Sequence, residues 1–161
     1  MKRMLSYFAA LCMALFALQA HAQSPAPAPA PAQYGTTQEA EAMVKKAIAF
    51  YKKNGKDKAI AEFNKNPGAF VDRDLYVTVY TPNADALAHI NPKMVGKNMM
   101  DLRDGDGKYH IKERMEMAQK ANSGWQDFSF YNPVQKKVEP KRMYWEKHDG
   151  LIFASGAYKP T

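Results

Sequence analysis

The chain has 161 residues, of which 46% are hydrophobic and 24% charged, and it carries a formal net charge of +7. Its single cysteine, Cys12, lies near the N-terminus, so the remainder of the chain can form no disulfide, thiolate nucleophile or haem attachment. Lysines are scattered among acidic residues, with no arginine-rich stripe. This pattern predicts a solvated basic surface and argues against nucleic-acid binding.

The first 22 residues have the pattern of a secretory signal peptide. Lys2 and Arg3 precede an apolar run over 5–18, which is followed by Ala20-His21-Ala22. The run is short for a membrane anchor, which needs about 20 apolar residues. A lipoprotein is excluded because Cys12 lies inside the apolar run and not at its end. We therefore predict cleavage after Ala22 and a periplasmic location.

A proline-alanine alternation over residues 23–34 separates this segment from the rest of the chain. Proline lacks a backbone N–H and fixes φ, so such a repeat forms an extended, semi-rigid linker. Residues 35–161 remain, and their number is that of one ordinary domain with a sizeable core.

Three helices are predicted in this domain. Thr36 and Glu39 have the spacing of a capping box, and an amphipathic pattern follows them to about Asn54 and Gly55. A second, short helix is predicted over 57–65 and a third over 110–121, where Ile111, Met115 and Ala118 share one face.

The strands are predicted from alternation and turn residues. Residues 75–80 and 86–90 flank a Pro-Asn-Ala-Asp turn and predict a hairpin; three further strands are expected over 125–131, 138–147 and 151–158. This order predicts an α+β fold with a five-stranded antiparallel sheet and helices packed to one side.

The first of these strands has two different faces. Leu75, Val77 and Val79 form an aliphatic face that suits a helix-covered core. Tyr76, Thr78 and Tyr80 form a hydroxyl-bearing face that could line a pocket for a small polar molecule.

Metal and catalytic motifs are weak. The histidines after the signal peptide, His89, His110 and His148, lack zinc-site spacing. Asp104 and Asp106 favour a glycine-aspartate turn over a calcium loop, since the later ligand positions of such a loop are filled by unsuitable residues. The methionine pairs at 99–100 and at 115 and 117 favour core packing over a copper site. No metal, cofactor or catalytic residue is predicted.

A ligand pocket has better support. Tyr76, Tyr80, Lys141, Tyr144 and Tyr158 all lie on strands that should converge. Lysine and tyrosine could together fix a small carboxylate. Strict alternation puts Lys141 and Tyr144 on opposite faces, so both reach one pocket only if the strand bulges near Pro140.

Strings along most of the domain resemble the single Cache family. The matching segments are 70–77, Ala88-His89, Asn91-Pro92 with 95–98, Asp101-Leu102, Asp104 with 106–108, Gly124-Trp125, Pro140-Lys141 with Tyr144, and Gly156 with Tyr158.

This resemblance implies a PAS-like extracytoplasmic sensor domain that binds small molecules, often organic acids. By position, it places Tyr76, His89, Trp125, Lys141 and Tyr144 in or beside the pocket. It also implies a membrane receptor or sensor kinase as partner. Two other functions stay open: a small secreted enzyme that uses His89 as acid or base, and a structural protein that binds a partner.

Overall fold

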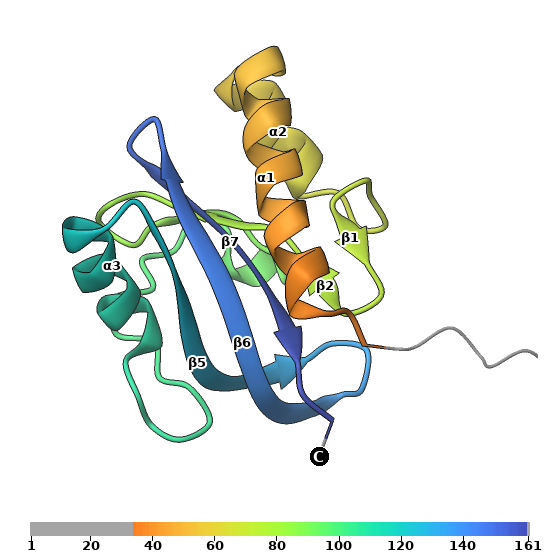
Figure 1. Cartoon of the computed structure of the whole chain (residues 1–161), viewed down its shortest axis with the longest axis vertical. Helices are drawn as coiled ribbons and strands as arrows, with labels where there is room; N and C mark the ends of the chain where they lie inside the picture. Colours follow the sequence, from red (N-terminus) through yellow and green to blue (C-terminus); the bar gives the residue numbers. More distant parts are fainter. Residues whose placement is uncertain (1–33, 161) are drawn as a thin grey trace, which may run out of the picture. The chain divides into compact units, whose positions relative to one another are not determined.

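The computed structural model describes residues 34–160 (Figure 1). The predicted signal peptide (1–22) and all but the last residue of the predicted linker (23–34) lie outside the described residues. The elements, in chain order, are α1 (Thr37–Asn54), α2 (Lys56–Phe63), β1 (Val71–Asp72), β2 (Leu75–Tyr76), β3 (Thr78–Tyr80), β4 (Ala86–Ala88), the 3-10 helix η1 (Pro92–Met94), α3 (His110–Lys120), β5 (Ser123–Asn132), β6 (Lys137–His148) and β7 (Leu151–Tyr158).

Helix α1 begins with the predicted capping box. The Thr36 hydroxyl accepts a hydrogen bond from the Glu39 N–H at 3.2 Å, and the Glu39 carboxylate accepts one from the Thr36 N–H at 2.8 Å. Two N–H groups that would otherwise lack partners are thus satisfied. Gly55 has φ = 80°, a left-handed value that suits glycine, and it separates α1 from α2.

Thr36→Ala should lower the free energy of unfolding by about 1 kcal/mol, because it removes the acceptor of the cap. Thr37→Ala is the matched control, since the Thr37 hydroxyl contacts only the Gln38 side chain among the hydrogen bonds found here. Urea unfolding of both variants measures the difference. Equal losses would contradict a specific role for the Thr36 cap.

The main sheet has five antiparallel strands in the order β4-β3-β7-β6-β5, which confirms the predicted fold class. The predicted strand over 75–80 is, however, divided at Val77. Tyr76 pairs with Val71 in a separate two-stranded ribbon, whereas Val79 pairs with Phe153 in the main sheet. The division occurs because the Val77 N–H bonds to the Phe70 carbonyl.

The sheet is covered on both faces, and the expectation of helices on one side is wrong. Helices α1 and α2 pack over Val77, Val79 and Phe153, while α3 packs over Met143 and Ile152. In Figure 1, α1 crosses β6 and β7 and α3 lies beside β5. The sequence of β7 explains this arrangement, because all eight of its residues are buried.

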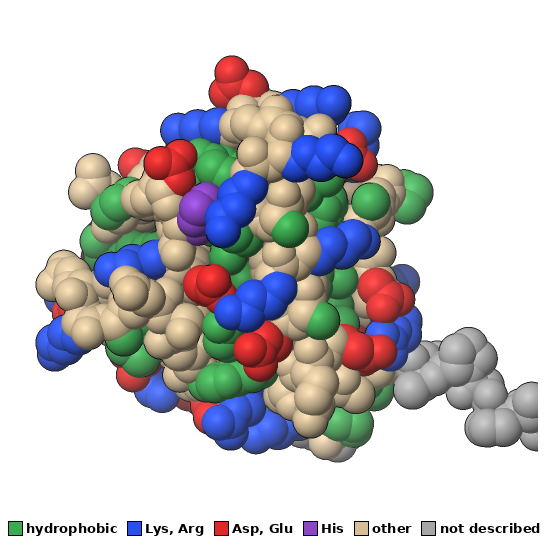
Figure 2. Space-filling view, turned by 45° about the horizontal axis from the view of Figure 1, so that its top comes forward, with side chains coloured by type: hydrophobic (Ala, Val, Ile, Leu, Met, Phe, Trp, Pro, Cys, Tyr) green, Lys and Arg blue, Asp and Glu red, His purple; other side chains and the backbone are tan. Residues whose placement is uncertain are grey.

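The surface carries no single-sign patch on the face shown in Figure 2. Basic and acidic side chains alternate over it, as the sequence pattern predicts. Among residues 34–160, no helix is both long and apolar enough to cross a membrane.

Candidate functional site

The hydroxyl-bearing face of β2 and β3 is buried against α3 and the long connection before it. There it lines a cavity of about 10 Å³, close to the smallest space that holds one water molecule. The polar lining residues are Tyr76, Thr78, Tyr80, His89, His110 and Arg114, and the apolar ones are Ile111, Phe128, Phe130 and Met143. The structure thus places a polar cavity on the face where the sequence suggested one.

Arg114 is the only arginine or lysine among the described residues that line this cavity. Its side chain is only 1% exposed, and its Nε donates to the Gln126 Oε1 at 3.0 Å. Gln126 is itself fixed, since its Nε2 donates to the His110 carbonyl and the Glu113 carboxylate, both at 2.8 Å. Burial lowers the pKa of Arg114, yet a guanidinium stays protonated in proteins.

One end of the Arg114 guanidinium has no partner among the described residues. Its Nη2 is buried without a hydrogen bond, and the ring centroids of Phe128 and Tyr80 lie 5.4 and 5.9 Å from its Cζ. A buried charge without its full set of hydrogen bonds is costly. Such a group is well suited to receive an anion, which would supply the missing acceptor.

Two neutral histidines complete the polar lining. Burial and the nearby charge of Lys141 lower the pKa of His89 to about 4, and burial and Arg114 do the same for His110. The His89 Nδ1 accepts the Asn91 N–H at 2.9 Å, so its proton lies on Nε2. His89 can therefore donate a hydrogen bond from Nε2.

Lys141 lies behind this lining, held between two tyrosine rings. It is 1% exposed, and its Nζ lies 4.0 Å from the ring centroid of Tyr76 and 4.1 Å from that of Tyr158. No described residue accepts a hydrogen bond from this Nζ. Burial lowers the pKa of Lys141 well below its usual range, although Asp74 opposes the effect.

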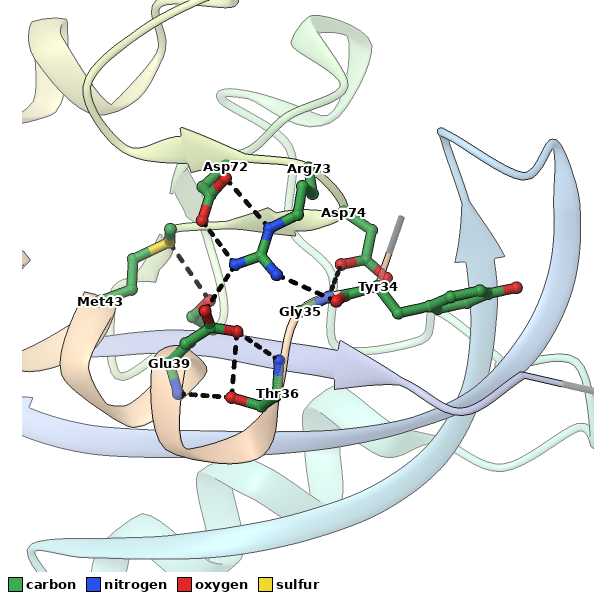
Figure 3. Close-up of polar contacts among 9 residues, drawn as sticks. Tyr34, Gly35, Thr36, Glu39, Met43, Asp72, Arg73 and Asp74 are labelled. Atoms are coloured by element: carbon green, nitrogen blue, oxygen red, sulfur yellow. Dashed lines mark hydrogen bonds and ion pairs between the residues drawn. The ribbon is translucent and has the colours of Figure 1, made fainter. Parts of the chain in front are cut away.

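Asp74 interacts electrostatically with Lys141 and also binds the backbone of Gly35 at the start of the domain. Its Oδ1 accepts the Gly35 N–H at 2.6 Å, while its Oδ2 is buried without a described partner. Burial raises the pKa of Asp74. Figure 3 shows the neighbouring Arg73, whose guanidinium contacts Glu39 at 2.8 Å, Asp72 at 2.7 Å and the Tyr34 carbonyl at 3.1 Å.

The structure brings together three of the five predicted site residues. Tyr76 and His89 line the cavity, with ring centroids 5.6 Å apart, and Lys141 lies against Tyr76. Trp125 and Tyr144 pack on the opposite face of the sheet, beneath α1, with ring centroids 5.1 Å apart.

The separation follows from the regular register of β6. Pro140 pairs with Ser129 and Lys141 with Phe128 in an unbroken ladder, so no bulge turns Tyr144 toward Lys141. Lys141 and Tyr144 therefore do not reach one pocket, because the bulge near Pro140 that this required is absent.

Arg114 and His110, which line the cavity, and Gln126, which holds Arg114, were not predicted. A signal for Arg114 was present, since it lies three residues after Ile111 and directly before Met115. It therefore falls within the apolar stripe of α3, where a charged residue is unusual. His110 and Gln126 carry no comparable local signal.

An outer groove of about 390 Å³ adjoins the cavity. It shares Tyr76, His89 and Phe130 with the cavity and adds Asn66, Ile90, Asn91, Met94, Tyr131 and Pro133. A larger cleft of about 710 Å³ lies at the β6–β7 turn, but its lysines already have partners. Lys45 pairs with Glu146, and Lys147 donates to the Ala118 carbonyl.

The glycine-aspartate segment forms the predicted turn. Burial alone would raise the pKa of Asp104, but the N–H groups of Lys108, Ser129 and Asp106 hold it below its usual range. These donors occupy both carboxylate oxygens. Within residues 34–160, no three His, Cys, Asp or Glu side chains are grouped to hold a metal ion.

Comparison with known families assigns the chain to one of them. Residues 30–151 match the family described as Single Cache domain 2. The match spans most of the chain, and the protein therefore belongs to the single Cache domain family. No curated protein matches the chain.

Solved structures of chemotaxis sensor domains have the same fold. A methyl-accepting chemotaxis protein from Vibrio parahaemolyticus is 26% identical, with a TM-score of 0.63 over 75% of this chain and 86% of that one. A periplasmic sensor domain of a chemotaxis protein is 19% identical (TM-score 0.59; 76% and 90% covered). A Cache chemosensory domain studied for carboxylic acid recognition is 18% identical (TM-score 0.59; 76% and 88% covered).

Proposed function

We propose that this protein is a periplasmic sensor domain that binds a small carboxylate, one oxygen of which enters the water-sized cavity beneath α3, without catalysis. The observation that carries the proposal is the unpartnered Nη2 of a fully buried Arg114 on the cavity wall. The free Nη2 can donate a charge-assisted hydrogen bond to a carboxylate oxygen, and such bonds are about twice as strong as those between neutral groups.

The neighbouring residues have complementary roles in this proposal. The His89 Nε2–H and the tyrosine hydroxyls on the cavity wall supply further donors. Lys141 does not line the cavity, and burial lowers its pKa well below the usual range, so the proposal gives its charge no part in binding. Trp125 and Tyr144 have no part in it, because they lie on the other face.

Arg114→Gln should weaken the binding of acetate or propionate about 30-fold or more, since truncating one member of a buried charge pair costs at least about 2 kcal/mol. Isothermal titration calorimetry measures this, and a ligand-induced rise in melting temperature provides a second readout. Methylammonium, a cation of similar size, should not bind.

Arg142→Gln is the matched control, because the Arg142 side chain is exposed, lies outside the cavity and contacts Asp127 at 3.7 Å. If Arg114→Gln does not fold, Arg114→Lys, which keeps the positive charge, tests whether acid binding depends on the guanidinium. Acid binding that is unchanged in both Arg114 variants, or absent from the unmodified protein, would contradict the proposal.

We further propose that the bound state is read by a membrane receptor or sensor kinase in the periplasm. The signal-peptide pattern of residues 1–22 and the likeness to a chemotaxis receptor support this location and partner class. Cell fractionation tests the location, and chemical crosslinking in intact cells with and without acetate tests the partner.

A further inference from the structure

We propose that the outer groove binds the apolar tail of the carboxylate, so that the preferred ligand is a monocarboxylic acid with a chain of several carbons. This rests on the proposed function, because the carboxylate head is taken to bind at Arg114. The groove then selects among carboxylic acids by the length and polarity of the tail, while the carboxylate head is common to all of them.

The groove has the size and the lining of a small-molecule site. Its volume of about 390 Å³ falls within the range of about 300–1,000 Å³ typical of ligand pockets. Apolar and aromatic side chains dominate its wall, namely Tyr76, Ile90, Met94, Phe130, Tyr131 and Pro133. The cavity alone, at about 10 Å³, is too small for a carbon chain.

The groove and the cavity adjoin each other at three shared residues. Tyr76, His89 and Phe130 line both spaces, and the His89 ring centroid lies 5.6 Å from that of Tyr76 and 6.3 Å from that of Phe130. In this proposal, a ligand whose head meets Arg114 passes between these three side chains into the groove. The N–H that holds His89 belongs to Asn91, which itself lines the groove.

The charge of the groove decides which tails it accepts. None of the nine described residues that line it is a lysine, arginine, aspartate or glutamate; its polar members are Asn66, His89 and Asn91. A second carboxylate or an ammonium group would lose its hydration there without gaining a charged partner. Dicarboxylates and amino acids are thus disfavoured relative to monocarboxylates of equal length.

The test is to titrate the unmodified protein with acetate, butyrate, hexanoate and octanoate by isothermal titration calorimetry. Each methylene that enters the groove should tighten binding about fourfold, the equivalent of about 0.8 kcal/mol. Adipate, which has the six carbons of hexanoate and a second carboxylate, should bind at least tenfold more weakly than hexanoate. Both comparisons use the unmodified protein.

Met94→Gln keeps the length of the side chain and makes it polar, and it should reduce the preference for hexanoate over acetate severalfold. Met100→Gln is the matched control. Met94 and Met100 are both partly buried and pack against the same core cluster, but only Met94 lines the groove. The control should keep the preference unchanged.

Three results would overturn the inference. Equal affinity for acetate and octanoate, with binding still dependent on Arg114, would reject the tail groove and leave the proposed function standing. Octanoate binding that survives Arg114→Gln would show adsorption to apolar surface alone. Absence of binding by every acid would reject the proposed function together with the groove.

Discussion

Lys141→Met is expected to raise the free energy of unfolding by about 1–3 kcal/mol at pH 7. The Lys141 ammonium is fully buried and donates no hydrogen bond to the described residues, so the folded state must either keep an under-solvated charge or release a proton. Replacing a buried charge with an apolar side chain of similar length is often stabilising by such an amount. The rings of Tyr76 and Tyr158 would pack against the methionine sulfur instead.

Lys147→Met is the matched control, because Lys147 lies on the same strand but its Nζ donates to the Ala118 carbonyl at 2.6 Å. Guanidinium unfolding of the two variants should show a gain for Lys141→Met and none for Lys147→Met. A loss of stability in Lys141→Met would mean that the Lys141 ammonium is satisfied in solution.

The advantage of Lys141→Met should also shrink as the pH rises from 7 toward 10.5. The pKa of Lys141 is lowered in the folded state, so the unfolded chain binds more protons below the ordinary lysine pKa. Stability of the unmodified protein therefore rises with pH through this window, while the methionine variant has no such contribution.

Acidification from pH 6.5 to pH 4.5 is the second change expected to have a large effect. His89 and His110 have pKa values lowered from 6.5 to about 4, so in this window the unfolded chain binds protons that the folded chain does not. Stability must then fall as the pH falls, by on the order of 2 kcal/mol for each histidine. Their sum is a large part of the stability of an ordinary domain.

His110→Phe isolates one of these contributions. Phenylalanine keeps the stacking with Phe128, whose ring centroid lies 4.5 Å from that of His110, but cannot take a proton. Burial is the main cause of the lowered pKa of His110; the charges of Arg114 and Lys141 lower it further, while Asp104 opposes them. The variant should lose less stability between pH 6.5 and pH 4.5 than the unmodified protein, as measured by urea unfolding at each pH.

His148→Phe removes a half-buried histidine outside the cavity and serves as the matched control. Carboxylates such as Glu39, whose pKa is lowered to about 2 chiefly by its hydrogen bond to Arg73, lose their contribution below pH 4.5. The stability that these carboxylates contribute is therefore lost at a lower pH than the range from 6.5 to 4.5 in which the histidines act. An identical pH dependence for His110→Phe and the unmodified protein would contradict the assignment.

Local chemistry was sufficient to predict most elements of this fold. The capping box at Thr36 and Glu39 marks the start of α1, and β7 has the bounds 151–158 predicted for it. Strand alternation also separated Val77 and Val79 from Tyr76 and Tyr80 correctly. Such features depend on residues close in sequence, so their physical causes are visible in the sequence itself.

The candidate site was decided by tertiary structure, because its members come from segments far apart in the chain. Arg114 is held by Gln126 of the next strand, and Lys141 lies between tyrosines of β2 and β7. The regular register of β6, which sends Tyr144 to the other face, depends on its pairing with β5. The sequence by itself determined most of the elements and the polar face of β2 and β3. Packing on both sides of the sheet decided which charged side chains face the cavity, because burial and pairing are properties of the folded chain.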